Sequence, residues 1–372
     1  MAGIYVHIPF CRSRCIYCDF FSTTLPPTWQ EPYVEAIGRE LELRAPKAIS
    51  SLYIGGGTPS LLAPEVLHRL FLLIERHVPL APDTEVTIEA NPDDVTPTWI
   101  ETLRETPVNR ISMGVQSLDD NILRTLRRRH TADKARQAVS LIQEAGYVNL
   151  SLDLIYGLPG QTLQQFSHDV RELLSLGIPH LSAYALQFEP DTPLSQMKER
   201  GEVGEADEEL SLACYESLLD LTAKAGFEHY EISNFALPGF RSRHNSSYWT
   251  GVPYIGLGAG AHSYDGVSTR SYNVEDISRY IQSLSHGTLP SYAEHLSEDE
   301  LYNERVMLSL RTSEGLSLSS LLRDFGPQRH SYCLRMAQPH ILGGRLKKTG
   351  ETLCLTRSGL FVSDDIISDM II

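Results

Sequence analysis

The chain has 372 residues, of which 42% are apolar and 21% are charged, a composition typical of a soluble globular protein. Its formal net charge of −15 argues against a nucleic-acid partner, because such partners are bound by basic side chains that neutralise phosphates. No segment reaches the roughly 18 apolar residues that span a bilayer, and the N-terminus lacks the features of a signal peptide. We therefore expect a cytoplasmic protein with at most peripheral membrane contact.

The first two-thirds of the chain alternate short β-branched runs with longer amphipathic segments. Strands are expected at 3–8, 51–54, 85–89, 110–114, 149–154 and 180–186, and helices at 32–45, 63–76, 96–105, 119–126, 131–145, 161–175 and 207–225. This α/β alternation predicts a parallel sheet covered by helices. Six units are compatible with a partial barrel or a doubly wound sheet, and in both folds the loops after the strands form the site.

The pattern changes after residue 227. Short, turn-rich segments continue to residue 273, and a helix is expected at 298–311. The end of the chain has the pattern of a helix, a hairpin around residues 348–351 and a final helix, which is a winged-helix-like α+β arrangement. We predict two domains, 1–235 and 236–372, the second containing a linker at 236–273 and a winged-helix-like unit at 298–372.

Three cysteines follow the first expected strand: Cys11, Cys15 and Cys18, with the spacing C-x3-C-x2-C. Clustered cysteines in a reducing compartment are typical metal ligands. Three thiolates would leave one iron of a four-iron cluster open to a small molecule, which is typical of a reactive metal site. A structural zinc site completed by His7 is an alternative, although it gives no role to the glycine-rich loop described next.

That loop, Gly55-Gly-Gly-Thr-Pro59, follows the second expected strand directly. Glycines allow the backbone to approach a ligand closely, and Thr58 adds a hydroxyl group. Four polar residues near the ends of later strands could face the same cavity: Glu89, Gln116, Arg128 and Asp153. An acid or amide in an otherwise apolar strand must be paired or face a cavity, so the group favours a ligand site.

The cysteine loop and the glycine-rich loop together resemble the radical S-adenosylmethionine (SAM) superfamily. The resemblance implies a partial (βα)6 barrel that resembles a TIM barrel, and a [4Fe–4S] cluster whose open iron is chelated by SAM. More narrowly, Tyr5-Val-His-Ile-Pro-Phe10, Gly114-Val-Gln-Ser117, Asp153-Leu-Ile-Tyr-Gly-Leu-Pro159 and the C-terminal unit are similar to the oxygen-independent coproporphyrinogen III oxidase group.

The similarity to that group implies roles for individual residues. The residues that would contact the cluster-bound SAM are Tyr5, Gly56 and Glu89. The positions that match contacts to a second SAM in the oxidases are Tyr17, Gly57, Thr58, Gln116, Arg128 and Asp153.

In two features the sequence departs from the oxidases and resembles the HemW-type haem chaperones instead. Phe20 stands where the oxidases have a further cysteine, and only ten residues precede Cys11. His244-Asn-Ser-Ser-Tyr-Trp249 matches the H-N-x-x-Y-W motif of those chaperones. Because imidazole is a common axial ligand of haem iron, His244 is the predicted haem ligand, with another histidine or a cysteine as the alternative. Tyr248 and Trp249 are expected to pack.

The predicted function is therefore a haem chaperone that holds a cluster and SAM, binds haem as cargo and passes it to acceptor proteins, respiratory ones included. A homodimer is compatible with this function. The alternative is an oxygen-independent oxidase that uses radical chemistry to convert coproporphyrinogen III to protoporphyrinogen IX. These two possible functions leave open whether the protein is an enzyme.

Overall fold

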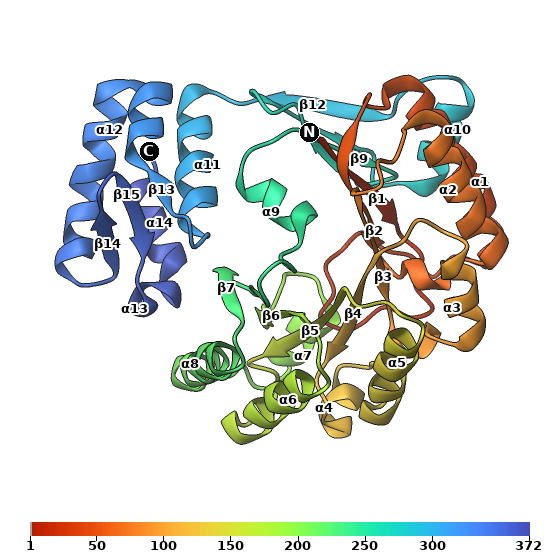
Figure 1. Ribbon diagram of the computed structural model, residues 1–372, viewed down its shortest axis with the longest axis horizontal. Coiled ribbons are helices and arrows are strands. Elements are labelled where there is room, and N and C mark those ends of the chain that lie inside the picture. The colour runs from red at the N-terminus through yellow and green to blue at the C-terminus, as the bar shows by residue number, and fades with distance from the viewer. Residues whose placement is uncertain (1) are drawn as a thin grey trace.

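The computed structural model describes residues 2–372. Six parallel strands form the centre of one twelve-stranded sheet, in the order β12-β11-β10-β9-β1-β2-β3-β4-β5-β6-β8-β7 (Figure 1). The strands are β1 (Ala2–Ile8), β2 (Ile49–Gly56), β3 (Glu85–Ala90), β4 (Arg110–Gln116), β5 (Leu150–Tyr156), β6 (His180–Ala185), β7 (Glu228–Glu231), β8 (Asn234–Ala236), β9 (Tyr254–Leu257), β10 (His262–Tyr264), β11 (Thr269–Asn273) and β12 (Ser291–His295).

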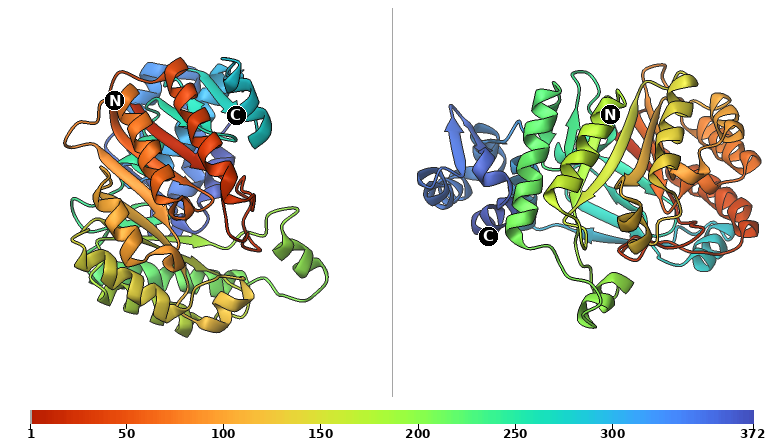
Figure 2. Two further views of the ribbon diagram at one scale, coloured as in Figure 1. Left: turned by 90° about the vertical axis from the view of Figure 1, so that its right-hand side faces the viewer. Right: turned by 90° about the horizontal axis from the view of Figure 1, so that it is seen from below.

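Helices cover the outer face of this curved sheet (Figures 1 and 2). They are α1 (Gln30–Arg44), α2 (Pro64–His77), α3 (Pro97–Arg104), α4 (Asp120–Thr125), α5 (Ala132–Glu144), α6 (Leu163–Ser175) and α8 (Glu208–Lys224). The segment with α7 (Pro193–Glu199) projects away from them (Figure 2). The partial (βα)6 barrel is thus confirmed, and the expected strands and helices up to residue 225 lie within a few residues of their observed bounds.

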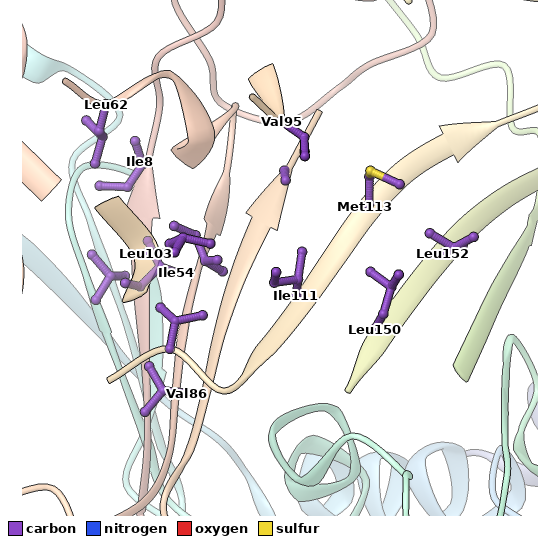
Figure 3. Packing of buried hydrophobic residues seen from close by; sticks show 14 of the residues in the cluster. Ile8, Ile54, Leu62, Val86, Val95, Leu103, Ile111, Met113, Leu150 and Leu152 are labelled. Carbon is purple, nitrogen blue, oxygen red and sulfur yellow. The ribbon is translucent and has the colours of Figure 1, made fainter. Parts of the chain in front are cut away.

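Alternation of residue type explains why one face of each central strand is covered and the other is not. In a strand, successive side chains point to opposite faces. The apolar residues of β2 to β5 pack under the helices; Figure 3 shows Ile54 beside Leu103 of α3, with Val86 and Ile111 on the next two strands. The residues between them are largely polar, such as Thr87 and Ser112. The inner face of the barrel is therefore built for a polar cavity.

Helix starts follow ordinary capping rules. Thr162 caps α6 in a capping box with Gln165, and the Asp119 carboxylate accepts the first backbone amides of α4. Such caps satisfy amides that have no partner inside the helix.

Residues 227–273, expected to be turn-rich, and residues 274–295, where no element was expected, hold more regular structure than the sequence indicated. They contribute the strands β7 to β12 and two helices, α9 (Arg243–Trp249) and α10 (Ile277–Ser285). All six strands have three to five residues, too short for a clear period-2 pattern. β9 pairs with β1 in parallel, and β10 to β12 continue the sheet as an antiparallel meander.

The C-terminal unit has a hydrophobic core of its own that begins at Tyr302 and ends at Met370. Its elements are α11 (Glu298–Leu310), β13 (Leu316–Ser317), α12 (Leu318–Leu342), β14 (Leu346–Thr349), β15 (Thr352–Leu355), α13 (Arg357–Leu360) and α14 (Ser363–Met370). α12 is broken at Gly326, whose φ is 78°. The three strands form a small sheet, as expected for a winged-helix-like unit, whereas the division of the chain after residue 235 stays a prediction.

Across residues 2–372, no helix combines the length and the apolar character that crossing a bilayer requires.

Candidate functional site: the cysteine loop and its cavity

The cysteine loop leaves the sheet at the carboxyl end of β1. Two backbone hydrogen bonds close its base, from Cys11 N to Thr23 O at 2.8 Å and from Thr23 N to Pro9 O at 2.7 Å. Cys11, Cys15 and Cys18 are half-buried free thiols. All three line one cavity of about 470 Å³ at the carboxyl ends of the central strands, where parallel sheets carry their sites.

The same cavity gathers nearly all the residues that the sequence singled out. It is lined by Tyr17, Gly56, Gly57, Thr58, Glu89, Gln116, Arg128 and Asp153. Only Tyr5 and His244 among the predicted site residues are absent from its lining.

The glycine-rich loop lies directly against the cysteine loop. Gly57 N donates to Ile8 O at 2.8 Å, and a Cβ at Gly57 would lie 2.8 Å from the carbonyl carbon of Pro9. The Thr58 hydroxyl donates to Cys11 Sγ at 3.5 Å. Glycine is therefore needed here because two backbones touch, and the contact brings a hydroxyl donor to the first thiol.

Two carboxylates face the cavity from β3 and β5. Glu89 accepts hydrogen bonds from Tyr53 OH at 2.8 Å and from Gly56 N at 3.0 Å. Burial raises the pKa of Glu89 to about 7, with a contribution from the nearby Asp153, and burial likewise raises the pKa of Asp153 to about 6. Ser112 donates to Asp153 at 3.4 Å. Such shifts are common where carboxylates await a ligand.

Gln116, at the end of β4 between these two strands, and the buried Arg128 complete this part of the lining. Gln116 has a φ of 68° beside a register shift between β4 and β5, and left-handed backbone is costly for a residue other than glycine. Arg128 donates to Gly114 O at 2.5 Å and to Cys15 Sγ at 3.3 Å. Its buried Nε finds no hydrogen-bond partner within residues 2–372. A buried donor without a partner is expected where a ligand binds.

Tyr5 lies on the inner face of the sheet but lines a second cavity, of about 380 Å³, next to the first. Its hydroxyl is 3.0 Å from His7 Nδ1, and His7 Nε2 is 2.7 Å from Phe21 O. Since a carbonyl oxygen only accepts, His7 donates through Nε2, and burial lowers its pKa and keeps the ring neutral. Tyr5 therefore donates to His7.

His7 is thus fully hydrogen-bonded, which bears on the zinc alternative. Within residues 2–372, no three histidine, cysteine or acidic side chains gather closely enough to hold a single metal ion. The set of three cysteines and His7 does not form a mononuclear zinc site in this arrangement.

His244 is 1% exposed and packs at the start of α9, outside both cavities. Its Nδ1 is 2.9 Å from Ser51 Oγ, its Nε2 is 2.9 Å from Tyr248 OH, and its ring stacks on Tyr53. Burial lowers its pKa to about 3, so the imidazole is neutral. Ligation of haem iron by His244 would require Tyr248 or Ser51 to give up its hydrogen bond.

Several cavity residues were not predicted from the sequence: Tyr53, Ser112, Ser182, Tyr184 and Asn245. Four of them occupy inward positions of β2, β4 and β6, so the polar positions in alternating strands were the available signal. Asn245 is the member of the H-N-x-x-Y-W motif that reaches the cysteine cavity.

Two family models match the chain. The radical SAM superfamily matches residues 5–173, and the HemN C-terminal domain matches residues 296–362. The solved structure of coproporphyrinogen III oxidase (HemN) from Escherichia coli superposes with a TM-score of 0.86 at 23% identity, over 100% of this chain and 90% of that one. This likeness shows that the two proteins share a fold.

Sequence relatives named heme chaperone HemW are more similar. The Mycobacterium tuberculosis protein is 37% identical over 99% of this chain and 94% of its own length. The Bacillus subtilis protein is 32% identical over 98% of both chains, and the Escherichia coli protein is 38% identical over 70% of this chain and 69% of its own. The chain therefore belongs to the HemW family of the radical SAM superfamily.

Proposed function

We propose that this protein is a cytoplasmic haem chaperone that carries a SAM-binding [4Fe–4S] cluster, binds haem and transfers it to acceptor proteins. The relatives named heme chaperone HemW, which match the chain over nearly its full length, support haem as the cargo. The single observation that supports the cluster is the convergence of Cys11, Cys15 and Cys18 on one cavity together with the glycine-rich loop.

The three cysteines would hold the cluster, which when bound supplies an electron to SAM. Burial raises the pKa of the Cys11 thiol and raises that of Cys18 to about 11, so their thiolate forms need compensating positive charge from a metal. Thr58 and Arg128 each donate a hydrogen bond to a cysteine sulfur. Such donors stabilise negative charge on the sulfurs and tune a cluster.

The remaining lining suits a ligand with the polar groups of SAM. Glu89 and Asp153 offer acceptors for ammonium and hydroxyl hydrogens, and the free Nε of Arg128 offers a donor for a carboxylate. Gly56 and Gly57 let such a ligand lie against the backbone, while Tyr17 and Gln116 line the side near β4. We assign Tyr5 to the same site through its place on the inner face of β1.

The oxidase is the second candidate, and the shared fold with HemN is the observation that favours it. Phe20 argues for the chaperone: it is 63% exposed at the edge of both cavities, at the position where the oxidases have a further cysteine.

The test uses full-length protein reconstituted with iron and sulfide without oxygen. It is offered haemin and, separately, coproporphyrinogen III with SAM and a reductant. We expect stoichiometric haem binding, seen as a shifted Soret band, transfer of haem to an apo-haemoprotein, and no protoporphyrinogen. Failure to bind haemin would exclude the chaperone function, and turnover of coproporphyrinogen would establish the oxidase.

We propose respiratory haem proteins as the acceptors. The protein would reach them by at most peripheral contact with a membrane. Sedimentation would test whether it acts as a homodimer. The net charge of −15 disfavours direct attraction to anionic lipid and is consistent with a protein partner.

A further inference from the structure

The second cavity joins three segments that are far apart in the sequence. Phe20 comes from the cysteine loop, Tyr248 from α9 and its H-N-x-x-Y-W motif, and His262 from β10. The rest of its lining is Tyr5, His7, Asp19, Phe21, Tyr254, Gly260, Ala261 and Glu275. Its volume is about 380 Å³, and it is largely aromatic, which is typical of sites for flat apolar ligands.

His262 differs from the other two histidines near the site. Within residues 2–372, His262 makes no hydrogen bond and no ion pair through its imidazole, whereas both ring nitrogens of His7 and of His244 have partners. His262 is also exposed, while the other two are buried. An imidazole that borders an aromatic cavity with its nitrogens free is available to ligate a metal.

The backbone at His262 is fixed by a close contact. A Cβ at Gly256 would lie 2.1 Å from the carbonyl oxygen of His262, so only glycine allows β9 and β10 to approach this closely. Gly256 N also donates to Ser263 Oγ at 2.9 Å. The imidazole is therefore displayed from a rigid strand.

A row of aromatic rings begins at His262 and crosses the edge of the sheet. His262 pairs with Tyr272, and Tyr272 pairs with Tyr292, in the registers of β10, β11 and β12. The ring centroids are 5.6 Å and 5.5 Å apart, with interplanar angles of 26° and 32°. Tyr272 is 41% exposed and Tyr292 is 46% exposed. His262 thus stacks on Tyr272, and Tyr292 follows as a tilted neighbour in the same row.

This arrangement matches the stereochemistry of an axially ligated porphyrin. The bond from an imidazole nitrogen to iron lies in the plane of the imidazole, so the porphyrin stands across that plane. A porphyrin on His262 would therefore lie across the edges of Tyr272 and Tyr292. Aromatic ring edges are positive and ring faces negative, so this edge-to-face contact is favourable.

Charge gives the ligand an orientation. Arg279 of α10 donates to Tyr292 OH at 3.2 Å, and it forms no ion pair among residues 2–372. The propionates of haem are negative, so they would point toward Arg279.

We propose that His262 is the axial ligand of the haem iron, with the porphyrin lying across Tyr272 and Tyr292 and one edge in the cavity beside Phe20. The inference rests on the proposed function, because it assigns the place where the cargo binds. It puts the haem next to the cysteine loop, in contact with Tyr248 rather than with His244.

The test titrates haemin into reconstituted full-length protein and into four variants: His262→Ala, His262→Met, His244→Ala and, as a matched control, His295→Ala. His295 is an exposed histidine on β12 of the same sheet, hydrogen-bonded to Thr269 at 3.1 Å. For His262→Ala we expect affinity to fall by about tenfold or more, equivalent to about 1.4 kcal/mol or more, and loss of the histidine-ligated spectrum. His262→Met should bind with an altered spectrum, and His295→Ala should match the unchanged protein.

The outcomes separate this inference from the proposed function. If the unchanged protein binds no haemin, both are overturned. If it binds and His262→Ala retains its spectrum and affinity, or His244→Ala alone abolishes ligation, only the assignment of His262 is overturned. Iron content and circular dichroism establish that each variant is folded. Tyr272→Leu, which keeps the imidazole, should lower affinity without changing the ligation spectrum.

Discussion

The contact between Gly57 and the cysteine loop leads to a quantitative prediction. In Gly57→Ala the new Cβ would lie 2.8 Å from the Pro9 carbonyl carbon and 2.9 Å from Phe10 O. Comfortable contact is about 3.5 Å or more, so one backbone must move by about 0.7 Å. Overpacking of this kind costs about 1–3 kcal/mol. The displaced segment leads directly into Cys11, whose sulfur accepts the 3.5 Å hydrogen bond from Thr58.

Urea unfolding of the apo-protein measures the stability change, and iron and sulfide analysis after reconstitution measures the effect on the cluster. Gly204→Ala is the matched control, because a Cβ there meets nothing within 4 Å and its φ lies outside the left-handed region. That control should change stability by less than about 1 kcal/mol, in the stabilising direction. Equal stability and equal iron content in the two variants would refute the argument that backbone contact positions the cysteine loop.

Three further predictions concern single side chains. Glu89 has its pKa raised from 4.5 to about 7, so the folded state binds more protons than the unfolded state between those values, and stability falls as pH rises through that window. At about 1.4 kcal/mol per pKa unit, the free energy of unfolding falls by about 3 kcal/mol across this window. Urea titrations at pH 5 and pH 8 should show a smaller fall in Glu89→Gln, and an equal fall in both proteins would contradict the prediction. Cys18→Ser should lose most of its reconstituted iron while Cys354→Ser keeps it; equal iron contents would remove Cys18 from the ligand set. His244→Ala should lower the free energy of unfolding by about 2–4 kcal/mol, because it leaves two hydroxyl groups without a partner and a buried cavity; an unchanged urea midpoint would show that the packing is not needed.

Local patterns were sufficient for most of the first 225 residues because the predicted strands and helices there are long enough to show their period; the seven-residue helix α7 was not predicted. The helix that begins after Thr162, for example, has both a capping box and an apolar face. The strands β9 to β12 could not be predicted in this way. They are three to five residues long, and what makes them strands is pairing with β1 and with each other.

The lining of the cysteine cavity was likewise predictable in part. Glu89 and Asp153 are visible in the sequence as acids in apolar strands, and they do face the cavity. Tyr53 looks like an ordinary strand aromatic, yet the register of β1 and β2 places it beside Tyr5 and within reach of Glu89. Its role depends on a partner 36 residues away, which no local pattern contains.

The sequence by itself determined which groups the first site offers, because the C-x3-C-x2-C thiols and the glycine-rich loop are local patterns that can be recognised without the fold. Only the tertiary structure decided which imidazole is free. His244 carries the motif but is buried with both nitrogens hydrogen-bonded, whereas His262 faces an aromatic cavity and neither of its nitrogens has a partner among residues 2–372. Burial and hydrogen bonding depend on residues brought together by folding, so a histidine's availability as a ligand is a property of the fold.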